Sequence, residues 1–570
     1  MNTKHLMAVS RGKEPAEKVF KNAQIINVYS GEIETADIAV EQGTIVGIGE
    51  YTGKTTIDCS NQYVAPGFID GHVHIESSML TPPSFAEVVV PKGTTTVIAD
   101  PHEIANISGV EGIKFMLKSS RNLPLNVHMM LPSCVPATPF ENAGATITKE
   151  DIEALKDEAG VLGLGEVMDY PAVLEGDANI HDKIRIMQPR VIDGHAPDVV
   201  GNDLNAYILA GVQTDHESTM VDALLARIRR GMYVHLREGS ATHNVEPLLK
   251  AVNARNLHRI LFCTDDKHPE DIKHEGHINH NINIAIKVGI DPLDAIRMGT
   301  INAAQAYRLD DVGAIAPGKR ADLVVFDSLD KVEPHEVYKD GTLVAKDGKA
   351  LFSHQTAPTD AVNKTVHVDV DSLDFSLKLK TDKARVIAII PKNITTKHEI
   401  RSVKRDDKGY YVNDSDDLLK IAVIERHKNT GNVGIGLVEG FGLKNGALAM
   451  SIAHDSHNII VVGDSDASMH KAVEAIDEMQ GGIALVKDNK LVDRLTLEIG
   501  GIMTNLAALD VQKTLERMRK QVKAMGLNET IDDPFITLAF LALPVIPALK
   551  ITDTGLFDVE AFTHIAIDPT

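Results

Sequence analysis

The sequence predicts an α/β protein: a TIM-type (β/α)8 barrel, a small β-sandwich domain built from both flanks of the barrel, and a C-terminal α+β domain. The first observation is that short apolar runs alternate with amphipathic stretches throughout residues 67–310. The second is that residues 19–66 alternate apolar and polar side chains between glycines, and a similar stretch runs from 321 to about 355. This pattern is typical of short antiparallel strands and places the small domain at 1–66 and 311–360. The third is a change of pattern beyond a polar linker at 356–365, which places a separate domain at 366–570.

Eight strands are expected in the middle segment. They are 68–74, 94–99, 125–131, 161–166, 190–195, 211–216, 232–237 and 259–264. Helical patterns separate most of them, for example at 84–90, 109–118, 149–158 and 219–230, and a further helix starts at Asp291-Pro292. The eight strand–helix units occupy about 245 residues, which is close to the usual size of a TIM barrel.

The C-terminal segment carries its own strand and helix signals. Strands are expected at 384–390 and 419–425, and a helix at 468–479. The longest apolar run, 535–549, falls short of the roughly 20 residues that a membrane span needs. We expect it to be a buried core segment.

Composition and charge narrow the classes of function. Of the 570 residues, 43% are apolar and 24% are charged, as in a folded soluble protein. Lys and Arg number 58 against 80 Asp and Glu, and the net charge of −22 disfavours binding to nucleic acid or to an anionic membrane. The three cysteines form no CxxC pair and the N-terminus has no apolar signal segment, so we expect a cytoplasmic protein.

Histidines at the end of the first barrel strand give the first chemical signal. His72 and His74 are separated by one residue, so their side chains point to the same face of the strand. Active sites of (β/α)8 barrels lie at the C-terminal ends of the strands. Both imidazoles are therefore expected to reach one metal ion.

Ionisable residues also stand at most of the other predicted strand ends. They are Asp100 with His102 and Glu103, Glu166, His195, His216, the group His235, Arg237 and Glu238, and the pair Asp265-Asp266. If the last strand continues, the side chain of Asp266 points to the face opposite that of Asp265. Scattered surface charges would not choose one end of the strands so regularly, so we interpret the set as functional.

Four histidines and two carboxylates form a mixed nitrogen and oxygen ligand set without a thiolate. Such a set suits Zn, Mn or Fe, and a shared carboxylate could bridge two ions. Two adjacent divalent ions lower the pKa of a bridging water and generate hydroxide at neutral pH. From the residues alone, the reaction class is metal-assisted hydrolysis.

The polar loop His454-Asp455-Ser456-His457-Asn458 leaves two interpretations open. It is either a polar turn before an apolar strand, or a loop that the C-terminal domain extends over the barrel mouth. Burying this many polar groups is costly unless each finds a partner.

Several strings resemble the amidohydrolase superfamily, and within it the bacterial adenine deaminase family. PGFIDGHVHIESS (66–78) and DVGAIAPGKRADLVVFD (311–327) carry the wider resemblance. The narrower one rests on Glu166, where many relatives place a carboxylated lysine, and on further strings along the chain. These are VIADPHEIANISG (97–109), DGHAP (193–197), TDHES (214–218), HLREGSA (235–241), FCTDDKHPEDI (262–272) and SIAHDSHNIIVVG (451–463).

The resemblance implies a ligand set. His72 and His74 would bind one metal, His195 and His216 the second, and Glu166 would bridge them. Asp265 would bind metal and shuttle protons. The family implies a dinuclear Mn²⁺ site, with Fe²⁺ or Zn²⁺ as other occupants.

The resemblance also implies the reaction. A metal-activated hydroxide would attack C6 of adenine, giving hypoxanthine and ammonia, as in purine salvage or adenine catabolism. We expect Asp265, Glu238, His102 and Glu103 to be catalytic, and Asp100, Arg237, His454 and His457 to bind the substrate. We expect adenine and water as the only small-molecule partners and a homo-oligomer, with a dimer as the first guess.

Two other functions stay open from the sequence. One is a cyclic-amide hydrolase of the same superfamily, similar to dihydroorotase or hydantoinase; a ligand set without a carboxylated lysine counts against many of these. The other is a non-catalytic metal-binding protein. The complete ligand set with Asp265 counts against that interpretation.

Overall fold

The computed structural model describes residues 3–569 except 198, 354–356, 392 and 416. Its middle segment contains eight strands in the predicted places: β6 (Phe68–Val73), β7 (Thr94–Ala99), β8 (Asn126–Leu131), β9 (Val161–Val167), β10 (Val191–Gly194), β11 (Thr214–Asp215), β12 (Tyr233–Arg237) and β13 (Ile260–Cys263). The prediction of all eight strands is therefore confirmed. These strands are almost entirely buried, which explains why they read as continuous apolar runs rather than alternating ones.

The eight strands form one curled parallel arrangement. Strands β6 to β10 make a five-stranded parallel sheet in chain order, and β11 to β13 a three-stranded one. Gln213 N donates to Ile192 O at 3.0 Å where β10 meets β11. At the other side, a parallel bridge joins Val73 to Asp265, and Asp265 N donates to His72 O at 2.9 Å. The carboxyl ends of β6 and β13 therefore lie side by side.

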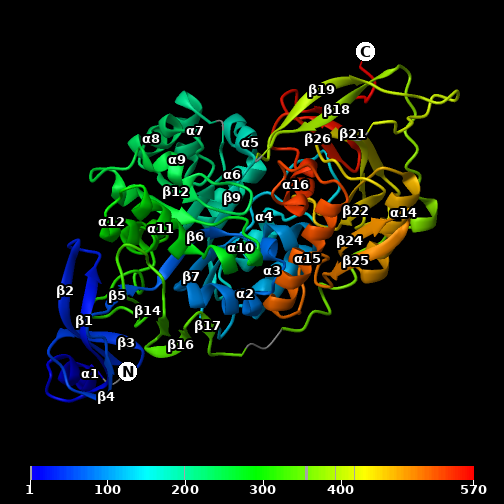
Figure 1. Cartoon of the computed structure of the whole chain (residues 1–570). Coiled ribbons are helices and arrows are strands. Elements are labelled where there is room, and N and C mark those ends of the chain that lie inside the picture. The colour runs from blue at the N-terminus through cyan, green and yellow to red at the C-terminus, as the bar shows by residue number, and fades with distance from the viewer. Residues whose placement is uncertain (1–2, 198, 354–356, 392, 416, 570) are drawn as a thin grey trace.

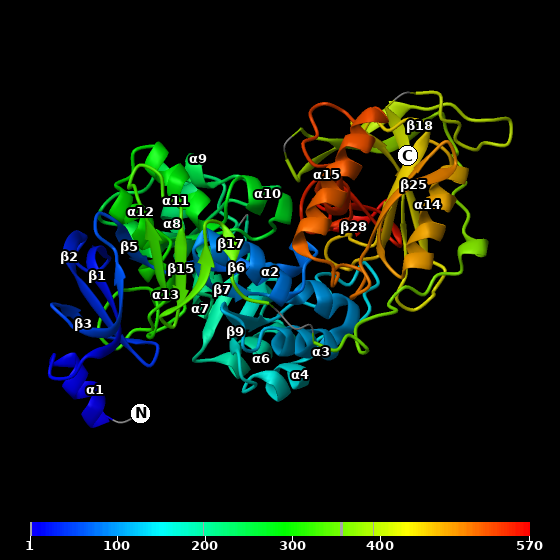
Figure 2. The same cartoon turned by 60° about the horizontal axis from the view of Figure 1, so that its bottom comes forward.

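Helices follow the strands and cover this arrangement from outside (Figures 1 and 2). They are α2 (Pro82–Val89), α3 (His102–Ser119), α4 (Lys149–Leu155), α5 (Tyr170–Glu175), α6 (Ala178–Met187), α7 (Gly201–Ala210), α8 (Val221–Arg229), α9 (Val245–Leu249), α10 (Pro269–His274), α11 (Ile278–Lys287), α12 (Pro292–Met298) and α13 (Ile301–Ala306). Among the described residues, no helix has the length and hydropathy of a membrane span.

Helix α3 starts seven residues earlier than the predicted 109–118. Its first turns begin at His102, directly after Asp100-Pro101, and Gly109 interrupts the helix with φ 57° and ψ −137°. That kink separates two helical stretches, so only the second shows a helical pattern in the sequence. The consequence is that His102 and Glu103 stand at a helix N-terminus beside the strand ends.

Both flanks of the parallel-strand segment contribute to one sheet of nine strands. The N-terminal flank gives α1 (Thr3–Ser10), β1 (Ala16–Asn27), β2 (Glu32–Glu41), β3 (Thr44–Gly49), β4 (Gly53–Asp58) and β5 (Tyr63–Pro66). The other flank gives β14 (Leu323–Phe326), β15 (Glu336–Lys339), β16 (Thr342–Lys346) and β17 (Lys349–Ala350). Antiparallel pairing of β5 with β14 joins the two flanks, with Val64 opposite Val325.

The C-terminal part (residues 366–569) is mostly sheet rather than evenly α and β. Eight strands form its main sheet: β18 (Lys383–Ile389), β19 (Thr396–Ser402), β20 (Leu418–Ile424), β21 (Val433–Glu439), β22 (Gly446–Met450), β23 (Ile459–Gly463), β24 (Gly482–Lys487) and β25 (Lys490–Thr496). A smaller sheet holds β26 (Leu549–Thr552), β27 (Gly555–Asp558) and β28 (Thr563–His564). The helices are α14 (Asp466–Met479), α15 (Ala508–Ala524) and α16 (Pro534–Ala539).

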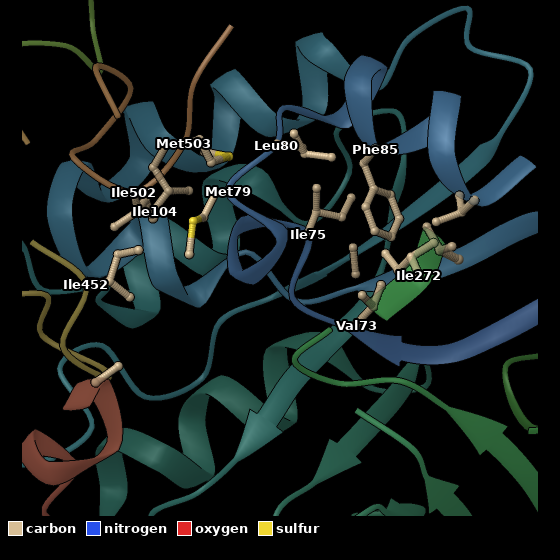
Figure 3. Close-up of a cluster of buried hydrophobic side chains, with 14 of the residues drawn as sticks. Val73, Ile75, Met79, Leu80, Phe85, Ile104, Ile272, Ile452, Ile502 and Met503 are labelled. Carbon is tan, nitrogen blue, oxygen red and sulfur yellow. The ribbon is translucent and has the colours of Figure 1, made fainter. Parts of the chain in front are cut away.

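The apolar run 535–549 is mostly buried, as predicted, and spans α16, a 3-10 turn and the start of β26. Apolar packing also joins the C-terminal part to the barrel. Figure 3 shows Ile452, Ile502 and Met503 beside Met79 and Ile104. This contact fixes the C-terminal part against the edge where the barrel strands end.

Candidate active site

The site is built from side chains at the carboxyl ends of the parallel strands. Glu166 of β9 lies between two pairs of histidines. Its Oε1 is 2.8 Å from His72 Nε2 and 2.8 Å from His74 Nε2. Its Oε2 is 2.8 Å from His195 Nδ1 and 3.7 Å from His216 Nε2. Each carboxylate oxygen thus serves one histidine pair.

Asp265 closes the site on the side of the first pair. Its Oδ1 is 3.1 Å from His74 Nε2 and 3.7 Å from His72 Nε2. Its other oxygen accepts a hydrogen bond from Arg237. The backbone of Asp265 has a φ of 60°, just past the end of β13, which turns the carboxylate inward.

Contacts at Nδ1 orient the rings of two of the histidines. Nδ1 of His72 lies 3.0 Å from Asp193 Oδ2, and Nδ1 of His74 lies 2.9 Å from the backbone oxygen of Asp100. An N–H bond at Nδ1 leaves Nε2 as the lone-pair nitrogen, and in both residues Nε2 faces Glu166. This is the arrangement that metal-ligating histidines adopt.

The donor atoms fit divalent metal ions. Glu166 Oε1 and His195 Nδ1 are buried and have no aligned hydrogen bond, although each lies 2.8 Å from another ligand-type atom. The ligand atoms of His72, Glu166, His216 and Asp265 all lie within 4.8 Å of one another. Buried polar atoms normally find partners, so a cluster that lacks them matches a cation site.

Electrostatics keep the two central carboxyls ionised. Burial opposes the charge of Glu166, but His216 and His72 hold its pKa well below the usual range. Burial likewise opposes the charge of Asp265, and the Arg237 guanidinium holds that pKa well below the usual range. Both groups are thus available as anionic ligands at neutral pH.

Arg237 is held by two carboxylates rather than standing free for a substrate. It donates to Asp265 through Nη1 and to Glu217 through Nη1 and Nη2, the latter at 3.2 Å. Glu217 Oε1 also lies 3.5 Å from His216 Nε2 and 3.6 Å from His195 Nδ1. The sequence prediction did not include Glu217, although it stands beside His216 in the TDHES string.

Asp193 is the other functional residue that the prediction missed. Besides His72, its carboxylate meets the hydroxyls of Thr214 and Tyr307, the latter at 3.3 Å. It lies in the DGHAP string, but nothing in that string says that it faces His72 rather than the next strand.

Four predicted site residues do not line the cavity of the site: His72, Asp100, Glu238 and His457. Glu238 is turned to a surface loop, with Oε1 2.7 Å from His243 Nδ1 and Oε2 accepting from Val245 N at 3.4 Å. Asp100 lies behind Glu166, whose backbone N donates to Asp100 Oδ2 at 2.9 Å. A Cβ atom at Gly165 would come within 2.1 Å of that oxygen, so this contact requires glycine.

The condition attached to the expectation for Asp266, that the last strand continues, is not met. Because β13 ends at Cys263 and Asp265 is in the left-handed region, strand alternation does not continue to Asp266. Its carboxylate accepts from the Ser77 hydroxyl and lies within 4.8 Å of ligand atoms of His74 and Asp265. Both aspartates therefore face the same site.

The His454–Asn458 loop reaches the start of helix α3. His454 Nδ1 lies 2.8 Å from Glu103 Oε1, and His457 Nε2 makes a close contact with Glu103 Oε2. Ala453 N donates to His457 Nδ1 at 3.3 Å, so Nε2 of His457 carries the proton that it donates to Glu103. His102 completes the group, with Nε2 3.5 Å from Glu103 Oε1.

A cavity of about 40 Å³ lies between the Glu166 cluster and the Glu103 cluster. His74, Glu103, Glu166 and Asp265 form its polar floor, and His454 also lines it. Residues of the C-terminal part supply an apolar wall made of Ile394, Phe540, Leu543 and Ile546. The ring of Phe540 stacks on that of His454 with centroids 4.6 Å apart. A polar floor below an apolar, partly aromatic wall suits a flat heterocycle.

Known proteins share this organisation. Residues 63–344 match the amidohydrolase family, and residues 393–563 match the adenine deaminase C-terminal domain. "Adenine deaminase 2" of Carboxydothermus hydrogenoformans is 47% identical over 565 residues, which cover 99% of both chains. The "Adenine deaminase" of Clostridium acetobutylicum is 48% identical over 97% of this chain and 98% of its own. That of Geobacillus kaustophilus is 45% identical over 99% and 98%.

A solved structure, the β-aspartyl dipeptidase of Fervidobacterium islandicum with a β-Asp-Leu dipeptide, aligns at 18% identity and a TM-score of 0.46. It covers 59% of this chain and 98% of its own.

Parallel strands whose carboxyl ends carry histidines around a shared carboxylate, together with the match at 63–344, define an amidohydrolase. The identities of 45 to 48% extend over nearly the whole length of the chain, including the C-terminal part. The chain belongs to the adenine deaminase family.

Proposed function

We propose that the protein hydrolyses adenine to hypoxanthine and ammonia. The observation that carries this proposal is the pairing of Glu166 with two histidine pairs beneath an apolar wall that the C-terminal part supplies. Relatives named adenine deaminase align with this chain over nearly their full length, and residues 393–563 match the adenine deaminase C-terminal domain. In the reaction, the oxygen of a water molecule bonds to C6, the bond from C6 to the exocyclic nitrogen breaks, and ammonia leaves.

We assign the metal-binding role to His72, His74, Glu166, His195, His216 and Asp265. Imidazole and carboxylate donors suit Mn²⁺, our first choice, and also Fe²⁺ or Zn²⁺. When bound, a pair of such ions lowers the pKa of a coordinated water so that it ionises near neutral pH. Asp193 orients His72 for this role, and Glu217 with Arg237 supports the second histidine pair and Asp265.

The proton transfers fall to the chain's own carboxylates and imidazoles. We assign Asp265 to take a proton from the attacking water and deliver it to the departing amino group. Glu103, with His454 and His457 on its two oxygens, is assigned to pass a proton from the His454 imidazole to the purine ring. Burial lowers the pKa of His454, but the Glu103 carboxylate raises it to about 9, so this imidazole carries a proton at neutral pH. His102 supports the same group.

We also propose finer features of the architecture. The eight strands would close as a TIM-type barrel over 67–310, the flanks 1–66 and 311–360 would form a β-sandwich, and 366–570 a third domain. The backbone contacts at both junctions of the parallel sheets support closure. We further propose a cytoplasmic homodimer that serves purine salvage. The three cysteines are free and buried, which fits a reducing compartment.

The test is a substrate screen on protein stripped of metal and reloaded separately with Mn²⁺, Fe²⁺ or Zn²⁺. Ammonia release from adenine, adenosine and cytosine is followed, beside ring opening of dihydroorotate and hydantoin. We expect ammonia from adenine alone, with the highest turnover in the Mn²⁺ form. Ring opening without adenine turnover would favour the cyclic-amide hydrolase, and no turnover of any substrate would favour a non-catalytic metal-binding protein.

A further inference from the structure

We propose that a groove at the amino ends of β11, β12 and β13 binds the phosphate group of a small phosphorylated ligand. The groove has a volume of about 430 Å³ and is lined by Gln213, Tyr233 and three arginines, among others. Gln213 precedes β11, Tyr233 begins β12 and Arg259 precedes β13. Arg237 and Asp265 stand at the other ends of β12 and β13, so the groove lies at the opposite end of these strands from the candidate active site.

The arginines come from three separate segments of the chain. Arg230 follows α8, Arg259 ends the 3-10 turn before β13, and Arg308 follows α13. None of the residues that line the groove is an Asp or a Glu. Guanidinium groups that converge on one concavity without a carboxylate create a local positive potential, which attracts anions.

Neutral acceptors hold each guanidinium. Arg308 donates to Pro189 O at 2.5 Å and to Gln213 Oε1 at 3.1 Å. Arg230 donates to Asn205 Oδ1 at 2.6 Å and to Ala226 O at 3.0 Å.

The third arginine, Arg259, donates to Gly231 O at 3.2 Å, and its guanidinium lies 4.5 Å from the centroid of the Tyr233 ring. These hydrogen bonds do not use Nη2 of Arg230, Nε of Arg308, or Nε and Nη2 of Arg259. The three side chains are therefore oriented but still have N–H donors to offer.

The arginines of the chain divide between those that pair with carboxylates and those held by neutral acceptors, as Arg385 and Arg426 also are. Asp and Glu outnumber Lys and Arg by 80 to 58, and Arg227, Arg237 and Arg519 all pair with carboxylates. Within the described part of the chain, no ion pair involves Arg230, Arg259 or Arg308. A phosphate oxygen triad matches the planar fork of several guanidiniums better than any single neutral acceptor does.

The experiment titrates inorganic phosphate, pyrophosphate and AMP into the metal-loaded full chain by calorimetry, at constant ionic strength. It compares the wild type with the triple variant R230Q/R259Q/R308Q and with R255Q, an exposed arginine that does not line the groove. We expect saturable binding in the wild type and in R255Q, and at least tenfold weaker binding in the triple variant. Adenine turnover without added anion should be equal in all three proteins.

Two comparisons complete the design. Tighter binding of AMP than of phosphate would identify a nucleotide as the source of the phosphate group, and equal affinities would identify free phosphate. If the triple variant unfolds, the single variant R308Q replaces it, because its loss frees only Pro189 O and Gln213 Oε1. Equal affinity in the wild type and in a folded groove variant, or no saturable binding in the wild type, would overturn the proposal.

Discussion

Glu103 and His454 are 351 positions apart in the chain, yet Glu103 Oε1 lies 2.8 Å from His454 Nδ1. The contact joins the start of helix α3 in the barrel to a loop of the C-terminal part, and His457 occupies the second oxygen of the same carboxylate. Glu103 thereby resembles Glu166, because each is one carboxylate shared between histidines. The site is complete only when both parts of the chain are present.

The first prediction concerns this loop. Replacing His454 and His457 together by Ala should lower adenine turnover by about 100-fold or more, since general acid–base catalysis contributes roughly 10² to 10⁴. Metal content should not change, because these histidines contact Glu103 rather than Glu166. Steady-state kinetics and metal analysis of the same preparation test both statements.

A matched control for the loop variant is His470→Ala in helix α14. This variant should behave as the wild type. Normal turnover of the double loop variant would show that the loop is only structural.

The second prediction concerns Glu166, the carboxylate proposed to bridge the two metal ions. Glu166→Ala should remove most bound metal and activity while the protein still folds, because both histidine pairs lose their common partner. Metal analysis after gel filtration, with circular dichroism as the folding check, measures this. His258→Ala is the control: His258 is exposed in the 3-10 turn Leu257–Arg259, before β13 rather than after it. Two equivalents of metal in Glu166→Ala, or metal loss in His258→Ala, would contradict the assignment.

The eight parallel strands, and the strand ends at which the proposed ligands stand, could be predicted because both are local properties of the sequence. A strand buried on both faces gives a continuous apolar run, and polar residues that end such runs must meet at one edge of the sheet. His72 and His74, two apart on β6, share a face for the same reason. The long-range contact between Glu103 and His454 has no such local signal, which is why the loop kept two interpretations.

The directions of some side chains could not be predicted, because strand alternation does not hold beyond the end of a strand. Asp266 lies beyond the end of β13, so period-two alternation does not govern its direction. Glu238 shows the opposite case: His235 and Arg237 of β12 face inward, and the next residue turns away to His243. Glu217 follows β11, which is only two residues long, so no strand pattern marked its direction.

The third prediction separates the two neighbouring aspartates. Asp265→Asn should lower turnover by at least about three orders of magnitude even with Mn²⁺ restored, since it removes both a metal ligand and a base. Asp266→Asn should keep its metal and lose less activity, because the Asp266 carboxylate accepts from Ser77 while that of Asp265 faces His74. Both variants are compared at matched metal occupancy. If Asp266→Asn is the inactive one, the proton shuttle belongs to the other carboxylate.

The last prediction concerns Lys550, a fully buried lysine of β26 whose Nζ donates to Ile394 O at 2.8 Å and to Phe540 O at 2.9 Å. Burial lowers the pKa of this amine from 10.5 to about 7. Between these values the unfolded chain binds a proton that the folded chain does not, so the free energy of unfolding rises with pH by about 1.4 kcal/mol per unit. Below pH 7 both states carry the proton, and the contribution becomes constant.

Lys550→Met removes the pH-dependent contribution of the buried amine to the free energy of unfolding, because methionine does not titrate. The substitution also leaves the carbonyls of Ile394 and Phe540 without their donor. The difference in Tm between the wild type and Lys550→Met should therefore grow steadily in favour of the wild type from pH 7.5 to pH 10, as measured by calorimetry at several pH values. Lys428→Met, at an exposed lysine, is measured beside it as the control substitution. The lost hydrogen bonds shift the Lys550→Met curve by a constant amount, so only the slope reports the buried amine. A parallel pair of curves would mean that Lys550 keeps its proton throughout this range in the folded protein.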